Sequence, residues 1–171
     1  RQKLLIKKAI KDKQINFLSH SENKGTSFAR NQIIKNSQSE LICFMDDDDY
    51  SDPQRIQKQV IQIIKSGYPK KKLIACCTGI EKVYKNGYTK VLNPLGSNGR
   101  YPNGKELADF LLFFYKKKGV DYGFALPTCC LMITKKCFEN FGYFDLNLER
   151  VEDMDLAIRL SMGDTIFTSV R

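Results

Sequence analysis

The acidic run at residues 46–49 constrains the fold of this chain more than any other feature of its sequence. Four consecutive aspartates directly follow LICFM (residues 41–45), an apolar segment of strand length. A continuous apolar strand is typical of the centre of an α/β sheet, where both faces are covered. Four carboxylates behind such a strand repel one another unless a cation neutralises them, and hard divalent cations bind oxygen ligands. If the extended geometry continues, Asp46 and Asp48 point the same way and share one cation.

The residues after the acidic run predict a helix. Asp52 is suited to cap this helix and Pro53 to occupy its first position. Four apolar residues then recur at helical spacing before Gly67, namely Ile56, Val60, Ile63 and Ile64. The acidic run therefore joins a buried strand to an amphipathic helix, at the end of a sheet where open α/β folds bind ligands. A solvated acidic turn without a metal stays open as the alternative, because short acidic patterns are common.

Other acidic motifs fit the run less well. An EF-hand loop beginning at Asp46 would need an oxygen ligand, a glycine and a glutamate where the chain has Tyr50, Ser51 and Gln57. A metal-dependent phosphatase of the Asp-x-Asp type also has its acids behind a strand, but typically has Thr or Val where Tyr50 stands. The phosphatase therefore stays as the weaker alternative.

Alternating apolar patterns along the chain predict an α/β fold with a mostly parallel sheet. Helices are expected over residues 1–12, 27–36, 53–67, 106–115, 135–140 and 152–162, and strands over residues 15–19, 41–45, 73–84, 88–92, 129–133 and 165–170. Asn86 and Gly87 are typical of the turn of a hairpin. Residues 99–105, GRYPNGK, match the core of a P-loop, but Glu106 stands where a hydroxyl must bind magnesium, so a flexible loop is predicted.

Length and composition fit one folded domain. The chain has 171 residues, 42% of them hydrophobic, and no apolar run reaches the ~18 residues of a membrane-spanning helix. Its net charge of +9 favours an anionic partner such as a nucleotide, a phospholipid surface or a nucleic acid. The six cysteines lack metal-binding spacing, so Cys43, Cys76 and Cys130 are predicted to be buried free thiols in a reducing compartment.

Three segments together resemble family 2 glycosyltransferases. They are ENKGTSFARN (residues 22–31), LICFMDDDDYSDPQRI (residues 41–56) and CLMITKKCFENFGYFDLNLERVEDMDLAIRL (residues 130–160), and they follow the order and approximate spacing of that family. The resemblance implies the GT-A fold, a Rossmann-like α/β/α sandwich, in a single partial domain over residues 1–171. The family's first β-α-β stretch, which contacts the base and ribose, is expected to be missing before Arg1.

The resemblance also implies a donor and a cofactor. The donor would be a nucleoside-diphosphate sugar, and Mg²⁺ or Mn²⁺ would neutralise its diphosphate leaving group. By position in the family's Asp-x-Asp and ARN segments, the implied donor contacts are Asn23, Gly25, Arg30, Asp46 and Asp47, and the implied metal ligands are Asp48 and Asp46.

The acids that open the last predicted helix allow two interpretations. Glu152, Asp153 and Asp155 lie in its first turn, where negative charge favours the helix dipole in any protein. The resemblance instead implies that Asp153 is the general base that deprotonates the acceptor hydroxyl, with inversion at the anomeric carbon, and that Glu152 orients Asp153 or the acceptor. It implies a structural role for Asp145.

The expected function is that of a cytoplasmic inverting glycosyltransferase, peripheral to an anionic membrane at its inner face. Its acceptor would be a glycan or a lipid-linked sugar in surface polysaccharide or lipopolysaccharide synthesis, and residues 93–128 would contribute to specificity. No nucleic acid partner is expected. The alternative from another class is a non-catalytic basic fragment that binds a membrane or a nucleic acid.

Overall fold

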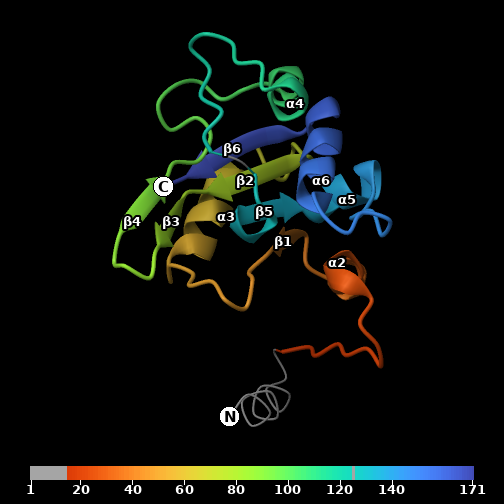
Figure 1. Cartoon of the computed structure of the whole chain (residues 1–171). Coiled ribbons are helices and arrows are strands. Elements are labelled where there is room, and N and C mark those ends of the chain that lie inside the picture. The colour runs from red at the N-terminus through yellow and green to blue at the C-terminus, as the bar shows by residue number, and fades with distance from the viewer. Residues whose placement is uncertain (1–14, 125) are drawn as a thin grey trace.

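The computed structural model describes residues 15–124 and 126–171. A sheet of four strands forms its centre (Figure 1). In spatial order the strands are β1 (Leu41–Cys43), β5 (Leu131–Thr134), β2 (Ile74–Thr78) and β6 (Ile166–Val170). β5 runs antiparallel to both β1 and β2, whereas β2 and β6 are parallel. Three of the four strands therefore run in one direction, which confirms an α/β fold with a mostly parallel sheet.

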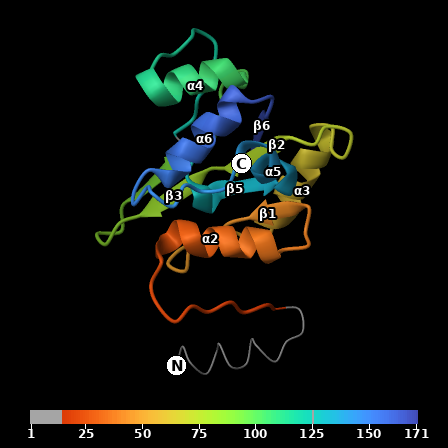
Figure 2. The same cartoon turned by 90° about the vertical axis from the view of Figure 1, so that its right-hand side faces the viewer.

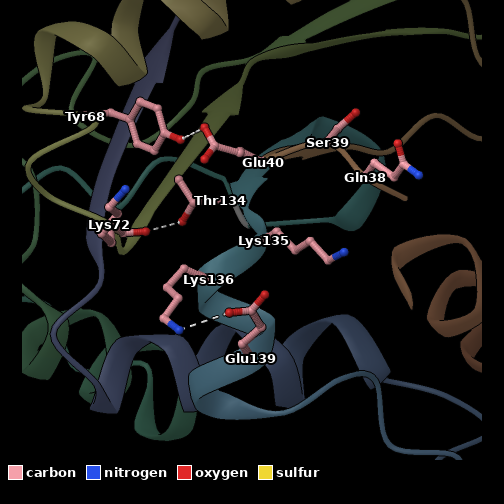
Figure 3. Close-up of a pocket in the computed structure, with 9 residues that line it drawn as sticks. All are labelled: Gln38, Ser39, Glu40, Tyr68, Lys72, Thr134, Lys135, Lys136 and Glu139. Atoms are coloured by element: carbon pink, nitrogen blue, oxygen red, sulfur yellow. Dashed lines mark hydrogen bonds and ion pairs between the residues drawn. The ribbon is translucent and has the colours of Figure 1, made fainter. Parts of the chain in front are cut away.

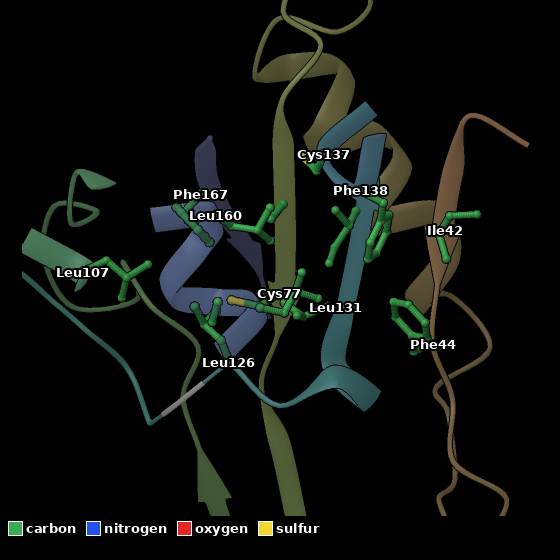
Figure 4. Close-up of a cluster of buried hydrophobic side chains, with 14 of the residues drawn as sticks. Ile42, Phe44, Cys77, Leu107, Leu126, Leu131, Cys137, Phe138, Leu160 and Phe167 are labelled. Carbon is green, nitrogen blue, oxygen red and sulfur yellow. The ribbon is translucent and has the colours of Figure 1, made fainter. Parts of the chain in front are cut away.

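Helices cover both faces of this sheet (Figure 2). They are α2 (Gly25–Asn36), α3 (Arg55–Lys65), α4 (Gly104–Phe113), α5 (Lys135–Phe141) and α6 (Glu152–Met162). Side chains alternate along β2: Ile74 and Cys76 pack with Ile63 of α3, whereas Ala75 and Cys77 belong to the larger cluster on the other face. Figure 4 shows this larger cluster, to which α2, α4, α5 and α6 all contribute.

The predicted strand over residues 73–84 is two strands. Gly79 separates β2 from β3 (Ile80–Val83), and β3 pairs with β4 (Thr89–Leu92) in a separate antiparallel hairpin. A β-carbon at Gly79 would lie 3.0 Å from the carbonyl oxygen of Leu92, so any other residue would require the Leu92 backbone to shift where the two sheets part. The expected turn at residues 86–87 is confirmed, with Gly87 at a φ of 82°.

Several predicted boundaries are wrong. Residues 15–19 form no strand and are exposed. β1 is therefore an edge strand of the described sheet rather than a central one. The strand expected over residues 129–133 starts later, because a 3₁₀ turn (η1, Thr128–Cys130) precedes β5. The helix expected over residues 1–12 falls outside the described residues. By contrast, α6 has the predicted bounds.

Glu106, the residue that breaks the P-loop pattern, lies in the first turn of α4 and forms a capping box with Asn103. Its backbone N–H donates to the side chain of Asn103 (2.9 Å), and its carboxylate accepts from the Asn103 backbone (3.0 Å) and from both terminal nitrogens of Arg100 (2.7 and 2.6 Å). The bonds from Arg100, followed by that from Asn103, lower the pKa of Glu106 to about 2. Glu106 therefore caps a helix and binds an arginine.

All six cysteines are free, as predicted, and Cys76, Cys77, Cys130 and Cys137 are buried. The predicted burial is therefore confirmed for Cys76 and Cys130 but is wrong for Cys43, which is partly exposed, as is Cys129. Burial raises the pKa of Cys76 to about 12, so this thiol stays protonated. Over the described residues, no helix has the length and apolar character needed to cross a membrane.

Candidate active site

The acidic run forms a turn rather than an extension of β1. The backbone N–H of Asp49 donates to the carbonyl of Asp46 (3.3 Å), so the chain reverses between them. The expectation that extended geometry aligns Asp46 with Asp48 is therefore wrong. The turn instead brings together Asp46, Asp49 and Cys129, with one potential ligand atom from each within 4.8 Å of the others.

This group can hold a divalent cation mainly through its oxygens. The hydrogen bond with the neighbouring Cys130 thiol, followed by burial, raises the pKa of Cys129, and a protonated thiol is a weak ligand. The carboxylates of Asp46 and Asp49 are the stronger ligands and suit Mg²⁺ or Mn²⁺. The sequence pattern did not indicate Asp49 as a ligand. The tendency of consecutive aspartates to form turns could have indicated it, because a turn brings Asp49 back toward Asp46.

Helix α3 fixes the backbone immediately before the acidic turn. Arg55 in its first turn donates to the carbonyl of Phe44 (3.1 Å) and to the side chain of Gln59 (3.1 Å). Gln59 is fully buried and donates to the carbonyls of Cys76 (2.8 Å) and Cys130 (3.1 Å). A buried amide is stable only when its polar atoms are paired, and here the pairing ties α3 to β1, β2 and η1. The apolar pattern of α3 did not reveal Gln59, which occupies the buried face beside Ile63.

Arg30 of α2 joins two predicted site segments. Its guanidinium donates to Glu152 (2.8 Å) and lies 3.5 Å from a carboxylate oxygen of Asp46. The same group lies 5.4 Å from the centre of the Phe144 ring. The side chain of Arg30 is 19% exposed and that of Glu152 is 16% exposed, so the pair is largely shielded from water. The structure thus brings the acidic turn and the start of α6 together around one arginine.

Asn31 holds α2 in the position that this contact requires. Its side-chain amide donates to the carbonyl of Phe144 (2.8 Å) and accepts from the backbone N–H of the same residue (3.0 Å). Both bonds are buried, and Asn31 is 6% exposed. The residue therefore connects α2 to the loop that leads into α6. An asparagine beside Arg30 gave no signal of this role in the sequence.

The first turn of α6 carries three acids with different partners. Glu152 binds Arg30, and Asp155 binds Arg159 (2.6 Å), which in turn donates to the carbonyl of Tyr143 (2.8 Å). Asp153 accepts from the backbone N–H of Met154 (2.8 Å) and forms no ion pair among the residues that the structure describes. Asp155 thus has a structural role, whereas Asp153 has no charged partner among the described residues.

Val151 gives α6 an unusual start. Its φ of 59° lies in the left-handed region, where a β-branched side chain is strained. The residue is 57% exposed, so burial of its side chain does not explain the conformation. The left-handed turn sets the direction in which Glu152 and Asp153 leave the preceding loop.

The remaining predicted residues lie as follows. The side chain of Asn23 accepts from the backbone N–H of Gly25 (2.9 Å), and Gly25 has a φ of 81°, so both shape the start of α2. Asp47 and Asp48 are exposed on the acidic turn. Asp145 accepts from the backbone N–H of Asn147 (2.9 Å), a local contact that agrees with its expected structural role.

A cavity of about 490 Å³ lies at the other end of the sheet (Figure 3). Its lining includes Glu40, which precedes β1, and Lys135, which follows the antiparallel strand β5, whereas the acidic turn follows β1. The polar groups here pair with one another: Tyr68 donates to Glu40, and Lys136 binds Glu139 (3.0 Å). The cavity is therefore separate from the acidic turn, which holds the candidate site.

Comparison with known proteins identifies the family. The model of the family described as Glycosyl transferase family 2 matches residues 2–132, which include α2, the acidic turn and most of the sheet, and end before α6. No curated protein matches the chain. The matched region covers well over half of the 171 residues. The chain therefore belongs to glycosyl transferase family 2 and has the Rossmann-like GT-A fold of that family.

Proposed function

We propose that this domain transfers a sugar from a nucleoside-diphosphate donor to a glycan or lipid-linked acceptor, with inversion at the anomeric carbon. The observation that carries the proposal is the contact of Arg30 with both Asp46 and Glu152. A transferase must hold the donor's leaving group beside the group that activates the acceptor. Here Arg30 contacts both the acidic turn and the start of α6, although 122 residues separate it from Glu152 in the chain.

The acidic turn supplies the donor half of the proposed site. Asp46 and Asp49, with Asp48 next to them, would hold Mg²⁺ or Mn²⁺, which neutralises the charge of a departing diphosphate. Arg30 lies at the edge of this group and offers a planar fork of donors that matches phosphate oxygens. Asp47 is exposed on the same turn and can contact the ribose of the donor.

Asp153 supplies the acceptor half. As the acceptor oxygen forms its bond to the anomeric carbon, the bond from that carbon to the diphosphate breaks and the hydroxyl proton passes to a carboxylate oxygen of Asp153. Attack from the face opposite the diphosphate inverts the configuration. Glu152, held by Arg30, fixes the first turn of α6 and thereby the position of Asp153.

We also propose that this transfer belongs to surface polysaccharide or lipopolysaccharide synthesis. It would take place on the cytoplasmic side of a membrane, where sugar nucleotides are made. Membership of the family favours a transferase over the Asp-x-Asp phosphatase. The non-catalytic alternative predicts that neither a nucleotide nor a sugar nucleotide binds at all.

The proposal is tested with a panel of sugar nucleotides. Binding is measured by titration calorimetry with Mn²⁺ and with a chelator, and donor hydrolysis is followed by release of the nucleoside diphosphate. We expect one donor to bind more tightly with the metal, and the sugar of the product to have the opposite anomeric configuration, as shown by NMR. Absence of binding for every donor would support the non-catalytic alternative, and retained configuration would refute the role of Asp153.

A further inference from the structure

The end of α4 exposes an unusual run of large apolar side chains. Leu112, Phe113, Phe114 and Tyr115 are consecutive and are 48%, 73%, 77% and 63% exposed. Three lysines follow at once, and we call residues 112–118 the aromatic–lysine segment. Isolated exposed apolar residues are common on soluble proteins, but a contiguous patch marks an interaction surface.

The backbone explains why these side chains point outward. Leu107 and Ala108 are buried and attach α4 to the core, and Phe110 packs on Tyr122 in the following loop, with ring centres 4.7 Å apart. Phe114 then adopts a left-handed φ of 56°, and its N–H donates to the carbonyl of Phe110 (2.9 Å), which ends the helix. In Figure 1, α4 and the loop after it form the top of the molecule, away from the sheet.

The charge of the aromatic–lysine segment indicates its partner. Residues 110–120 contain three lysines and no acidic residue. Lys116 lies over the Phe110 ring at 5.1 Å, and Lys117 contacts Glu106 at 3.3 Å, yet the Lys117 side chain is still 61% exposed. Positive charge therefore borders exposed aromatic rings on one short segment. An anionic membrane surface offers phosphates for the lysines and an apolar boundary for the rings.

We propose that the aromatic–lysine segment docks this domain on an anionic lipid bilayer. Phe113, Phe114 and Tyr115 enter the boundary between headgroups and acyl chains, and the lysines lie at the level of the lipid phosphates. A single short segment of this kind binds reversibly, and each lysine near an anionic surface strengthens binding about fivefold. The proposal does not depend on the identity of the donor or the acceptor.

Direct insertion is measured with a fluorescent residue. The sequence contains no tryptophan, so Phe113→Trp introduces a single indole, whose emission is excited selectively over that of the eight tyrosines. We expect its emission to shift to the blue, and to be quenched by brominated lipids, with vesicles of phosphatidylcholine and phosphatidylglycerol. Val91→Trp is the matched control, because Val91 is 67% exposed on the β3–β4 hairpin. Unchanged emission of Phe113→Trp, or an equal shift in both variants, would overturn the proposal.

Charge reversal separates the segment from the net charge of the protein. Lys116→Glu with Lys118→Glu should weaken binding to the same vesicles by at least about tenfold. Lys82→Glu with Lys85→Glu changes the net charge equally on the hairpin and should change binding by less than about threefold, since distant exposed charges are screened. Equal losses in the two double variants would mean binding through net charge alone and would refute the docking site.

Two further measurements test whether a second copy of the chain covers the segment and whether each variant folds. If a second copy of the chain covered the aromatic residues, the parent protein would be a dimer in gel filtration and Phe113→Ser a monomer, which would overturn membrane docking. Thermal unfolding of each variant confirms that it folds. Nucleotide binding should be unchanged in all of them, so a failure of docking leaves the proposed transferase function intact.

Discussion

Arg30→Ala should destabilise the protein and weaken nucleotide binding together. The substitution removes a donor that lies 2.8 Å from Glu152 and leaves that carboxylate, 16% exposed, without its partner. An exposed ion pair contributes about 0.2–1 kcal/mol, whereas breaking a buried pair costs about 3–5 kcal/mol. The Arg30–Glu152 pair lies between these limits, and the contact with Asp46 is longer and 44% exposed at the aspartate. We therefore expect a loss of about 1–2 kcal/mol in the free energy of unfolding.

Denaturant unfolding and calorimetry measure the two effects on the same sample. Arg30→Lys keeps the charge but loses the planar fork, so both effects should be intermediate. Arg100→Ala is the matched control, because it removes a pair with Glu106 in which the arginine is 50% exposed, and it should leave nucleotide affinity unchanged. A loss within about 0.5 kcal/mol for Arg30→Ala, with unchanged nucleotide affinity, would refute the role of Arg30 as the link between the two halves.

Four further predictions concern single residues. Asp153→Asn should lower turnover by ~100-fold or more in a transfer assay while donor affinity in calorimetry stays constant; full activity would mean that the base lies elsewhere. Asp49→Asn should weaken Mn²⁺-dependent nucleotide binding more than Asp48→Asn does, because the turn directs Asp49 toward the other ligands; the reverse order would favour the extended Asp-x-Asp arrangement. Because the pKa of Glu106 is lowered, its ionised carboxylate stabilises the protein above the ordinary carboxyl pKa of about 4.5, and this contribution is lost as the pH falls toward 2. The unfolding temperatures of Glu106→Gln and of the parent should therefore converge near pH 2. Val151→Gly should stabilise the protein by about 0.5–1 kcal/mol in denaturant unfolding, since relief of left-handed strain exceeds the added entropy of glycine; destabilisation would show that Val151 is not strained.

The sequence was sufficient where the structure depends on local patterns. The amphipathic run before Gly163 predicted α6 correctly, and residues 86–87 predicted the hairpin, because capping, turn preference and helical spacing act over a few residues. The antiparallel position of β5 between β1 and β2 was not predictable in this way, since it depends on pairing between strands far apart in the chain.

In the candidate site, too, some residues could be predicted from local sequence patterns and others could not. Residue type and position predicted the segments that hold Arg30, Asp46 and Glu152, and the structure brings these three together. The turn that selects Asp49, and the bond of Asn31 to Phe144, depend on local geometry and tertiary packing that a short pattern does not encode. The assumption of extended geometry after β1 failed because the backbone bond between Asp49 and Asp46 favours a turn.

The place of β5 in the sheet has a consequence for synthesis of the protein. β1 and β2 do not pair with each other, because β5 lies between them and pairs with both. A nascent chain that has not yet reached Leu131 therefore holds β1 and β2 as separate strands with unpaired backbone edges. Such edges invite pairing with other chains, and contacts between distant residues slow folding. The domain should consequently fold as one cooperative event only after the segment with β5, α6 and β6 has been synthesised, with its site assembled when α6 docks on α2 through Arg30 and Glu152.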